Sequence, residues 1–132
     1  MIVWTIGIVL GGVVVNKKLF DSEAKVMEII WLNSPISAKE ISLIAADTIG
    51  WNKNTTYTVI KKLEAKGFIE RKDPGFICIP LVSQNQIQKV ETASLLEKVF
   101  GGSRKALFSA LIEDEPLTEE EINELRKLID NG

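Results

Sequence analysis

The chain has 132 residues, enough for one domain or two very small ones. Hydrophobic residues make up 45% and charged residues 26%, which is typical of a folded globular chain and excludes wholesale disorder. With a formal net charge of −2, one Cys and no His, the composition excludes Ser-His-Asp and Cys-His catalysis, His-ligated zinc and an intramolecular disulfide.

The first part of the chain, residues 1–17, begins with the uncharged apolar segment MIVWTIGIVLGGVVV. This segment is shorter than the roughly 20 apolar residues of a membrane-spanning helix. The basic pair Lys17-Lys18 follows it, whereas a secretory signal has basic residues in front. We favour a translated leader, because Gly11-Gly12 can be encoded by a GGAGG ribosome-binding sequence and Val15 by a GTG start codon. A membrane-surface anchor and an extra β-strand are the alternatives.

Two helices are predicted next along the chain. Apolar residues at helical spacing predict the first helix over about 22–33, with Asp21 and Ser22 as its cap residues. Ser37 and Glu40 then have the spacing of a capping box, which predicts the beginning of a second helix.

A third helix and a hairpin complete this part of the chain. The helix is predicted from about Asn54 to Lys66 and is closed by Gly67. Two short apolar runs, 68–72 and 76–80, flank a Pro-Gly turn and predict a β-hairpin. Three helices followed by a hairpin predict a mainly α (α+β) fold, with a winged helix-turn-helix DNA-binding domain over residues 18–82. Its predicted core contains Val26, Ile30, Ile41, Val59 and Leu63.

The third predicted helix has two unlike sides when about 100° is allowed per residue. The apolar side is predicted to pack inward and contains Thr56, Val59, Ile60 and Leu63. The other side is polar, and residues 51–72 as a whole carry a net charge of +4. Asn can pair with adenine in the major groove, while Lys and Arg suit phosphates. The alternative is a charged face that meets only water. The predicted DNA-binding residues are Lys53, Asn54, Thr55, Tyr57, Thr58, Lys61, Lys62, Arg71 and Lys72.

The last fifty residues are predicted to form three short amphipathic helices. Capping boxes begin at Ser83 and Thr118, and Ser103 is a further cap residue. Because such helices have little interior of their own, residues 83–132 are predicted to be a helical dimerisation domain. Packing back on the winged helix is the alternative. The predicted dimerisation residues are Leu95, Leu96, Val99, Phe100, Leu107, Phe108, Leu111, Ile122, Leu125, Leu128 and Ile129.

Several runs of the sequence, in this order, resemble bacterial regulators of the penicillinase-repressor family (BlaI/MecI/CopY). They are 22–31, 38–41, 51–63, 66–71, 80–83, 100–103 and 117–129. The resemblance covers about residues 18–131. It implies a cytoplasmic homodimeric repressor that binds an inverted-repeat operator in double-stranded DNA and controls β-lactam-resistance, metal-homeostasis or related stress genes.

The chain departs from the family pattern at three places. Better-known members have Lys and Arg where this chain has Asn54 and Tyr57, which leaves the operator sequence open. Copper-responsive members end in paired Cys motifs, whereas the lone Cys78 is predicted to be a small apolar filler. In β-lactam-responsive members an upstream sensor protease pathway cuts an Asn-Phe bond, and Ala110-Leu111 falls near that place here.

Enzymatic function is not predicted. The carboxylates of Glu119, Glu120, Glu121 and Glu124 lie near the beginning of a helix, without His, Cys or a Gly-rich loop beside them. No cofactor, metal or small-molecule substrate is indicated by any motif. The alternative function is a winged-helix protein-interaction module tethered to the membrane by residues 1–15.

Overall fold

The computed structural model describes residues 8–10, 13–15 and 18–131. Two compact units divide the chain, one up to Thr92 and one from Ala93 onward. We refer to them as the winged-helix unit and the C-terminal unit. Helix α4 (Gln84–Phe100) begins in the first and ends in the second.

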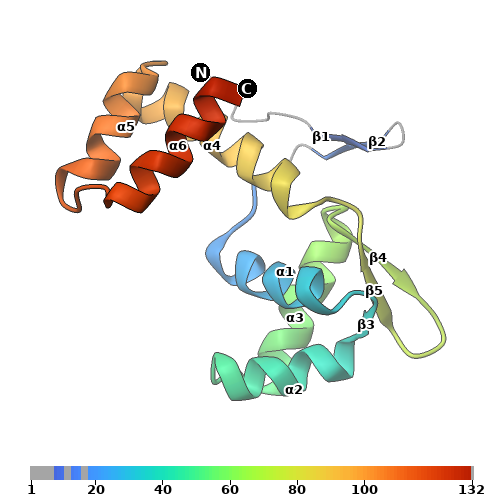
Figure 1. Ribbon diagram of the computed structural model, residues 1–132. Coiled ribbons are helices and arrows are strands. Elements are labelled where there is room, and N and C mark those ends of the chain that lie inside the picture. Colours follow the sequence, from blue (N-terminus) through green and yellow to red (C-terminus); the bar gives the residue numbers. More distant parts are fainter. Residues whose placement is uncertain (1–7, 11–12, 16–17, 132) are drawn as a thin grey trace. The chain divides into compact units, whose positions relative to one another are not determined.

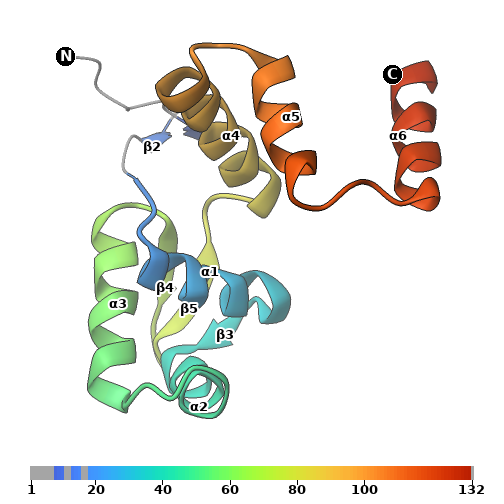
Figure 2. The same ribbon diagram turned by 90° about the vertical axis from the view of Figure 1, so that its left-hand side faces the viewer.

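Three helices and a small sheet form the winged-helix unit (Figures 1 and 2). The helices are α1 (Asp21–Asn33), α2 (Ala38–Thr48) and α3 (Lys53–Ala65). The hairpin that the sequence predicted is present as β4 (Ile69–Lys72) and β5 (Ile77–Pro80), paired antiparallel. This order of elements confirms the predicted winged helix-turn-helix.

A third strand, β3 (Ile36–Ser37), was not predicted from the sequence. It pairs antiparallel with β5, so that the sheet order is β3-β5-β4. Two residues, of which the second is also the helix cap of α2, are too few to show the alternation of a strand, and only the pairing with β5 defines them as one. The strand joins the beginning of α2 to the wing.

The core of the winged-helix unit lies between the three helices and the sheet. All five residues of the predicted core are buried, and Phe68, Met27 and Ile60 are the largest additions to it. Cys78 is fully buried on β5, as expected for an apolar filler. Burial, reinforced by the charge of Glu64, raises the pKa of its thiol to about 11. The thiol is therefore protonated and unreactive near neutral pH.

The beginning of α1 differs from the prediction. Asp21 and Ser22 lie inside the helix, and Phe20 is the N-cap residue. Glu23 is buried because its carboxylate pairs with the Lys66 ammonium at 2.8 Å, and the same oxygen accepts the Phe20 backbone N–H at 2.9 Å. An acid in the third helical position thus caps the helix, which a search for Ser, Asp or Asn at the N-cap does not detect.

Other predicted helix boundaries are confirmed. Ser37 accepts the Glu40 backbone N–H at 3.1 Å and begins α2. Gly67, with φ +83, follows the end of α3. Ser83 and Gln86 form the predicted reciprocal box that begins α4.

The boundary between the two parts of the chain falls later than the sequence suggested. The first turns of α4 belong to the winged-helix unit, because Ile87 is buried in its core. Trp31 on α1 also donates its indole N–H to the Val82 carbonyl at 2.8 Å, just before this helix. Along the chain, the division between the two compact units therefore falls after Thr92, within α4. The predicted boundary after residue 82 lies before this division.

The C-terminal unit contains the end of α4, then α5 (Arg104–Glu113) and α6 (Glu119–Asn131). Gly101 and Gly102 have φ of +56 and +84 and end α4, as predicted. Ser103 caps α5, and Thr118 with Glu121 forms the box that begins α6. In α5 and α6 no residue is buried.

Strands β1 (Ile8–Leu10) and β2 (Val13–Val15) pair antiparallel near the beginning of the chain. The extra-strand alternative thus describes these six residues. The leader and anchor interpretations depend mainly on residues that lie outside the described ones. None of the helices in the described ranges is both long and apolar enough to cross a bilayer.

Candidate nucleic-acid interface

Helix α3 divides into a buried and an exposed side, as its sequence predicts. Thr56, Val59, Ile60 and Leu63 are buried, and α3 packs against α1 and α2. Asn52, to which the sequence assigned no role, caps this helix by accepting the Thr55 backbone N–H at 2.8 Å. Because the inward side is held by the core, the orientation of the other side is set by the fold.

The outward side of α3 presents polar and basic groups. Thr58 donates its hydroxyl to the Asn54 carbonyl at 2.8 Å, which leaves its methyl group and the two lone pairs of the hydroxyl oxygen for an outside contact. No acid precedes Glu64 in this helix, and Glu64 is only half-buried near its end. The exposed predicted residues on α3 are Lys53, Asn54, Thr55, Thr58, Lys61 and Lys62.

Tyr57 is placed differently from the other predicted residues of α3. It is half-buried, and its ring forms a T-shaped pair with the Phe76 ring, at 6.0 Å between centroids and 89° between planes. The Lys53 ammonium lies 5.5 Å from the centroid of the Tyr57 ring. The structure thus brings Tyr57 to the wing, and its contact with a base stays a prediction.

The wing carries the other two predicted residues, Arg71 and Lys72, and both are exposed. Arg71 Nε donates to Asp73 at 3.1 Å, and Lys72 Nζ lies 3.0 Å from Glu70. Exposed ion pairs of this kind contribute about 0–1 kcal/mol. Lys72 can therefore exchange Glu70 for a phosphate at little cost, and Arg71 can bind one through the donors that Asp73 does not use.

Two residues change the interpretation of the positively charged residues 51–72 and of the wing. Lys66 counted toward the net positive charge, but its ammonium pairs with buried Glu23 and lies 4.1 Å from the centroid of the Phe20 ring. It belongs to the packing of α1 on α3. Phe76, in contrast, lies against predicted site residues on both α3 and the wing, and only its position directly after the Pro-Gly turn could have drawn attention to it.

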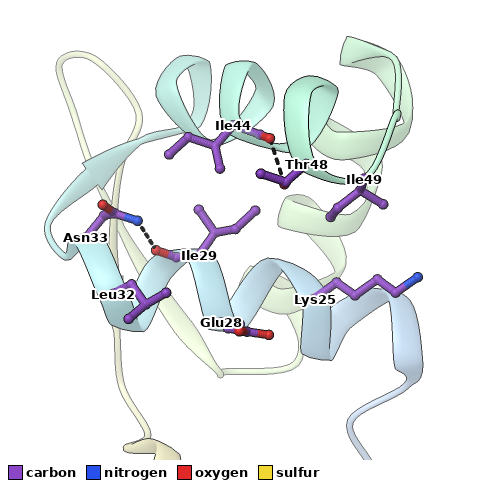
Figure 3. Close-up of a pocket in the computed structure, with 8 residues that line it drawn as sticks. All are labelled: Lys25, Glu28, Ile29, Leu32, Asn33, Ile44, Thr48 and Ile49. Carbon is purple, nitrogen blue, oxygen red and sulfur yellow. Dashed lines mark hydrogen bonds between the residues drawn. The ribbon is translucent and has the colours of Figure 1, made fainter.

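A separate groove lies between α1 and α2 (Figure 3). It is lined by aliphatic side chains together with Lys25 and Glu28, and it contains none of the predicted DNA-binding residues. The Asn33 amide donates to the Ile29 carbonyl and the Thr48 hydroxyl to the Ile44 carbonyl, both at 2.8 Å. With these donors used inside the helices, the groove offers few polar groups to orient a small molecule.

All of the predicted dimerisation residues are partly or largely exposed. On α5 and α6, Leu111, Leu128 and Ile129 expose 66%, 70% and 77% of their surface. On α4, Leu95 and Val99 expose 44% and 63%, and Leu96 and Phe100 are half-buried. Phe108 exposes 43%, and the remaining members of the set, Leu107, Ile122 and Leu125, are half-buried.

Three helices, a wing and a polar, basic outward side on the third helix define this chain as a winged helix-turn-helix protein of the DNA-binding class. The family model described as "Penicillinase repressor" matches residues 19–131. The chain therefore belongs to the penicillinase repressor family, as its sequence motifs suggested.

Curated relatives resemble the chain over most of its length. The penicillinase repressor of Bacillus licheniformis is 27% identical over 115 residues, which cover 86% of this chain and 90% of that protein. The methicillin resistance regulatory protein MecI of Staphylococcus aureus (strain N315) is 32% identical over 114 residues, covering 85% and 93%. A solution structure of the DNA binding domain of the repressor BlaI matches 53% of this chain and 92% of that chain, with 28% identity and a TM-score of 0.48.

Proposed function

We propose that this protein is a transcriptional repressor that binds an inverted-repeat operator in double-stranded DNA as a homodimer. One observation carries the proposal: α3 presents exposed Lys, Asn and Thr side chains on its outward side while its inward side is buried in the core. A helix held in this way can enter the major groove and present polar groups to base edges.

The predicted residues divide into two roles. Asn54 and Thr58 are suited to base edges, through an amide and through a methyl with a hydroxyl oxygen. Lys61, Lys62 and the wing cations Arg71 and Lys72 are suited to phosphates, which fix the position of the protein but carry no sequence information. Specificity is thus expected from α3 and general affinity from α3 and the wing together.

Dimerisation is expected to involve the C-terminal unit. Its helices expose large apolar side chains along α4, α5 and α6, and large apolar patches on soluble proteins commonly mark interfaces. A second copy would bury these side chains and tether two winged helices. The second half-site is then bound at a high effective concentration, with half-sites about 34–36 Å apart or a multiple of that spacing.

The names of the relatives, a penicillinase repressor and a methicillin resistance regulatory protein, support a regulatory role in β-lactam resistance. We expect the protein to act in the bacterial cytoplasm. An upstream sensor protease would release the operator by cutting the C-terminal unit. Ala110 and Leu111 on α5 are both exposed and are the candidate place for such a cut. Loss of the tether would then weaken operator binding without any change in the winged helix.

A salt titration tests the proposal against the membrane-tethered interaction module. The purified full chain is titrated with random duplex DNA and with fragments selected from genomic DNA by the protein. A repressor binds both with a steep negative dependence on salt concentration and binds the selected fragments more tightly. The absence of salt-dependent binding to any duplex would refute the proposed function.

A further inference from the structure

Four side chains from α3 and the wing form a continuous row, Lys53–Tyr57–Phe76–Arg71, which we call the cation–aromatic row. The Lys53 ammonium lies 5.5 Å from the Tyr57 ring centroid, and the Tyr57 and Phe76 rings meet edge to face at 6.0 Å. At the other end, Arg71 Cζ lies only 3.7 Å from the Phe76 ring centroid. Cations over ring faces and perpendicular ring pairs are both attractive arrangements. The row therefore connects the first turn of α3 to the wing.

The backbone determines where the Phe76 ring lies. Phe76 has φ +49, the left-handed region that a bulky side chain rarely adopts, and it follows Gly75 with φ +97. Its carbonyl accepts the Ala38 backbone N–H at 2.9 Å, which ties it to the beginning of α2. A strained residue held by a neighbouring element is a common feature of functional positions. The ring is thus fixed with respect to the helices rather than carried by a mobile wing tip.

The ring in turn restricts Arg71. One of the five N–H donors of its guanidinium, Nε–H, is used by Asp73. Asp73 on one side and the ring face on the other hold the group, so that its four remaining donors, on the two Nη atoms, are presented together. A side chain held in this way loses little freedom when it binds a phosphate.

We propose that Phe76 is a positioning residue for DNA binding, which holds Arg71 on the wing and Lys53 with Tyr57 on α3 at a fixed separation. The two cations at the ends of the row then bind phosphates of the same half-site as one unit. Phe76 itself makes no charged contact with DNA. This inference rests on the proposed DNA-binding function and adds to it a residue that neither charge nor polarity would select.

Phe76→Leu tests the proposal because it removes the ring but no charge. We expect it to weaken binding of operator and random duplex by the same factor. Each lost phosphate contact reduces the slope of log K against log salt by about 0.9, so that loss of the Arg71 contact in both half-sites of a dimer reduces it by about 2. The matched control is Phe20→Leu, which removes a ring that also lies under a lysine, at the far end of α3. The control should bind both duplexes as the wild type does.

A double-mutant cycle separates positioning from general destabilisation. If the ring positions Arg71, then Arg71→Ala should reduce the salt slope in the wild type but add little in the Phe76→Leu chain. Phe76→Tyr, which keeps the ring, should restore binding. Additive effects of the two substitutions, or a wild-type salt slope for Phe76→Leu, would overturn the inference.

Arg71→Lys provides a second test of the positioning role, which can be used if the Phe76→Leu chain does not fold. It keeps the charge but replaces the planar group that lies over the ring, so it should weaken binding by a smaller factor than Arg71→Ala does. Wild-type affinity for Arg71→Lys would overturn the positioning role of the ring. Failure of the wild-type chain to bind any duplex would instead refute the proposed function, so the two failures are distinguishable.

Discussion

The winged-helix unit and the C-terminal unit differ in how far their apolar residues are buried. In the first, Val26, Ile30 and Ile41 are completely buried between helices and sheet. In the second, α5 and α6 bury no residue, and Leu128 and Ile129 are mostly exposed. Burial of a large aliphatic side chain contributes about 1.5–3 kcal/mol. The first unit is therefore stabilised by its own core, while the second lacks a comparable contribution as a single copy and is expected to obtain it from a partner.

The largest loss of operator affinity is expected from Leu125→Asp. A charge placed in the apolar stripe of α6 should dissociate the dimer, because an unpaired buried charge is costly. Losing the tether should reduce operator affinity by about 10²–10⁴-fold, while the winged-helix unit stays folded. Sedimentation and operator titration measure the two effects.

The matched control for this prediction is Asn123→Asp, which adds the same charge at an exposed position of α6. It should remain dimeric. A folded Leu125→Asp monomer that binds the full operator with wild-type affinity would contradict the role assigned to the C-terminal unit.

Truncation tests where the winged-helix unit ends along the chain. A chain ending at Ser83 loses Ile87, which is buried in the core of the winged-helix unit, whereas a chain ending at Thr92 keeps it. We expect the shorter chain to be less stable by about 2–5 kcal/mol, the usual cost of removing a large aliphatic side chain from a core. Urea unfolding of both chains provides the measurement. Equal stability would mean that the first turns of α4 do not contribute to this core.

Base recognition by the winged-helix unit is tested with Asn54→Ala. We expect a loss of about 1–3 kcal/mol in operator binding, with binding to random duplex nearly unchanged. Asn85→Ala, an exposed Asn to Ala change on α4, is the matched control and should leave both affinities unchanged. Equal operator affinity for Asn54→Ala and the wild type would mean that the recognition side of α3 is wrongly assigned.

The smallest effect is expected from Lys72→Ala. Because Lys72 is assigned to a phosphate, its loss should weaken every duplex by a similar factor and reduce the salt slope by about 0.9 for each contact removed. Lys25→Ala on α1 removes the same charge from outside the predicted interface. A change of operator specificity in Lys72→Ala would show that the wing reads bases.

Local signals in the sequence were sufficient for most of the elements. The boxes at Ser37, Ser83 and Thr118 each begin a helix because the side chain and the backbone N–H that it accepts are only three residues apart. The same holds for the two sides of α3, since 3.6 residues per turn place Thr56, Val59, Ile60 and Leu63 together. These features depend on residues that are close in sequence, and they also carried the resemblance to the family.

The tertiary structure decided what depends on residues far apart in the sequence. Glu23 caps α1 because Lys66, 43 residues later, draws its carboxylate into the interior. Ile36 and Ser37 form a strand only because β5 lies beside them, and the winged-helix unit extends into α4 because Ile87 reaches its core. Tyr57 resembles a base-reading residue by its place on α3, yet its ring packs against Phe76, 19 residues away. Periodicity and spacing report which side of an element faces inward, but the partner that a side chain meets is determined by how the elements pack.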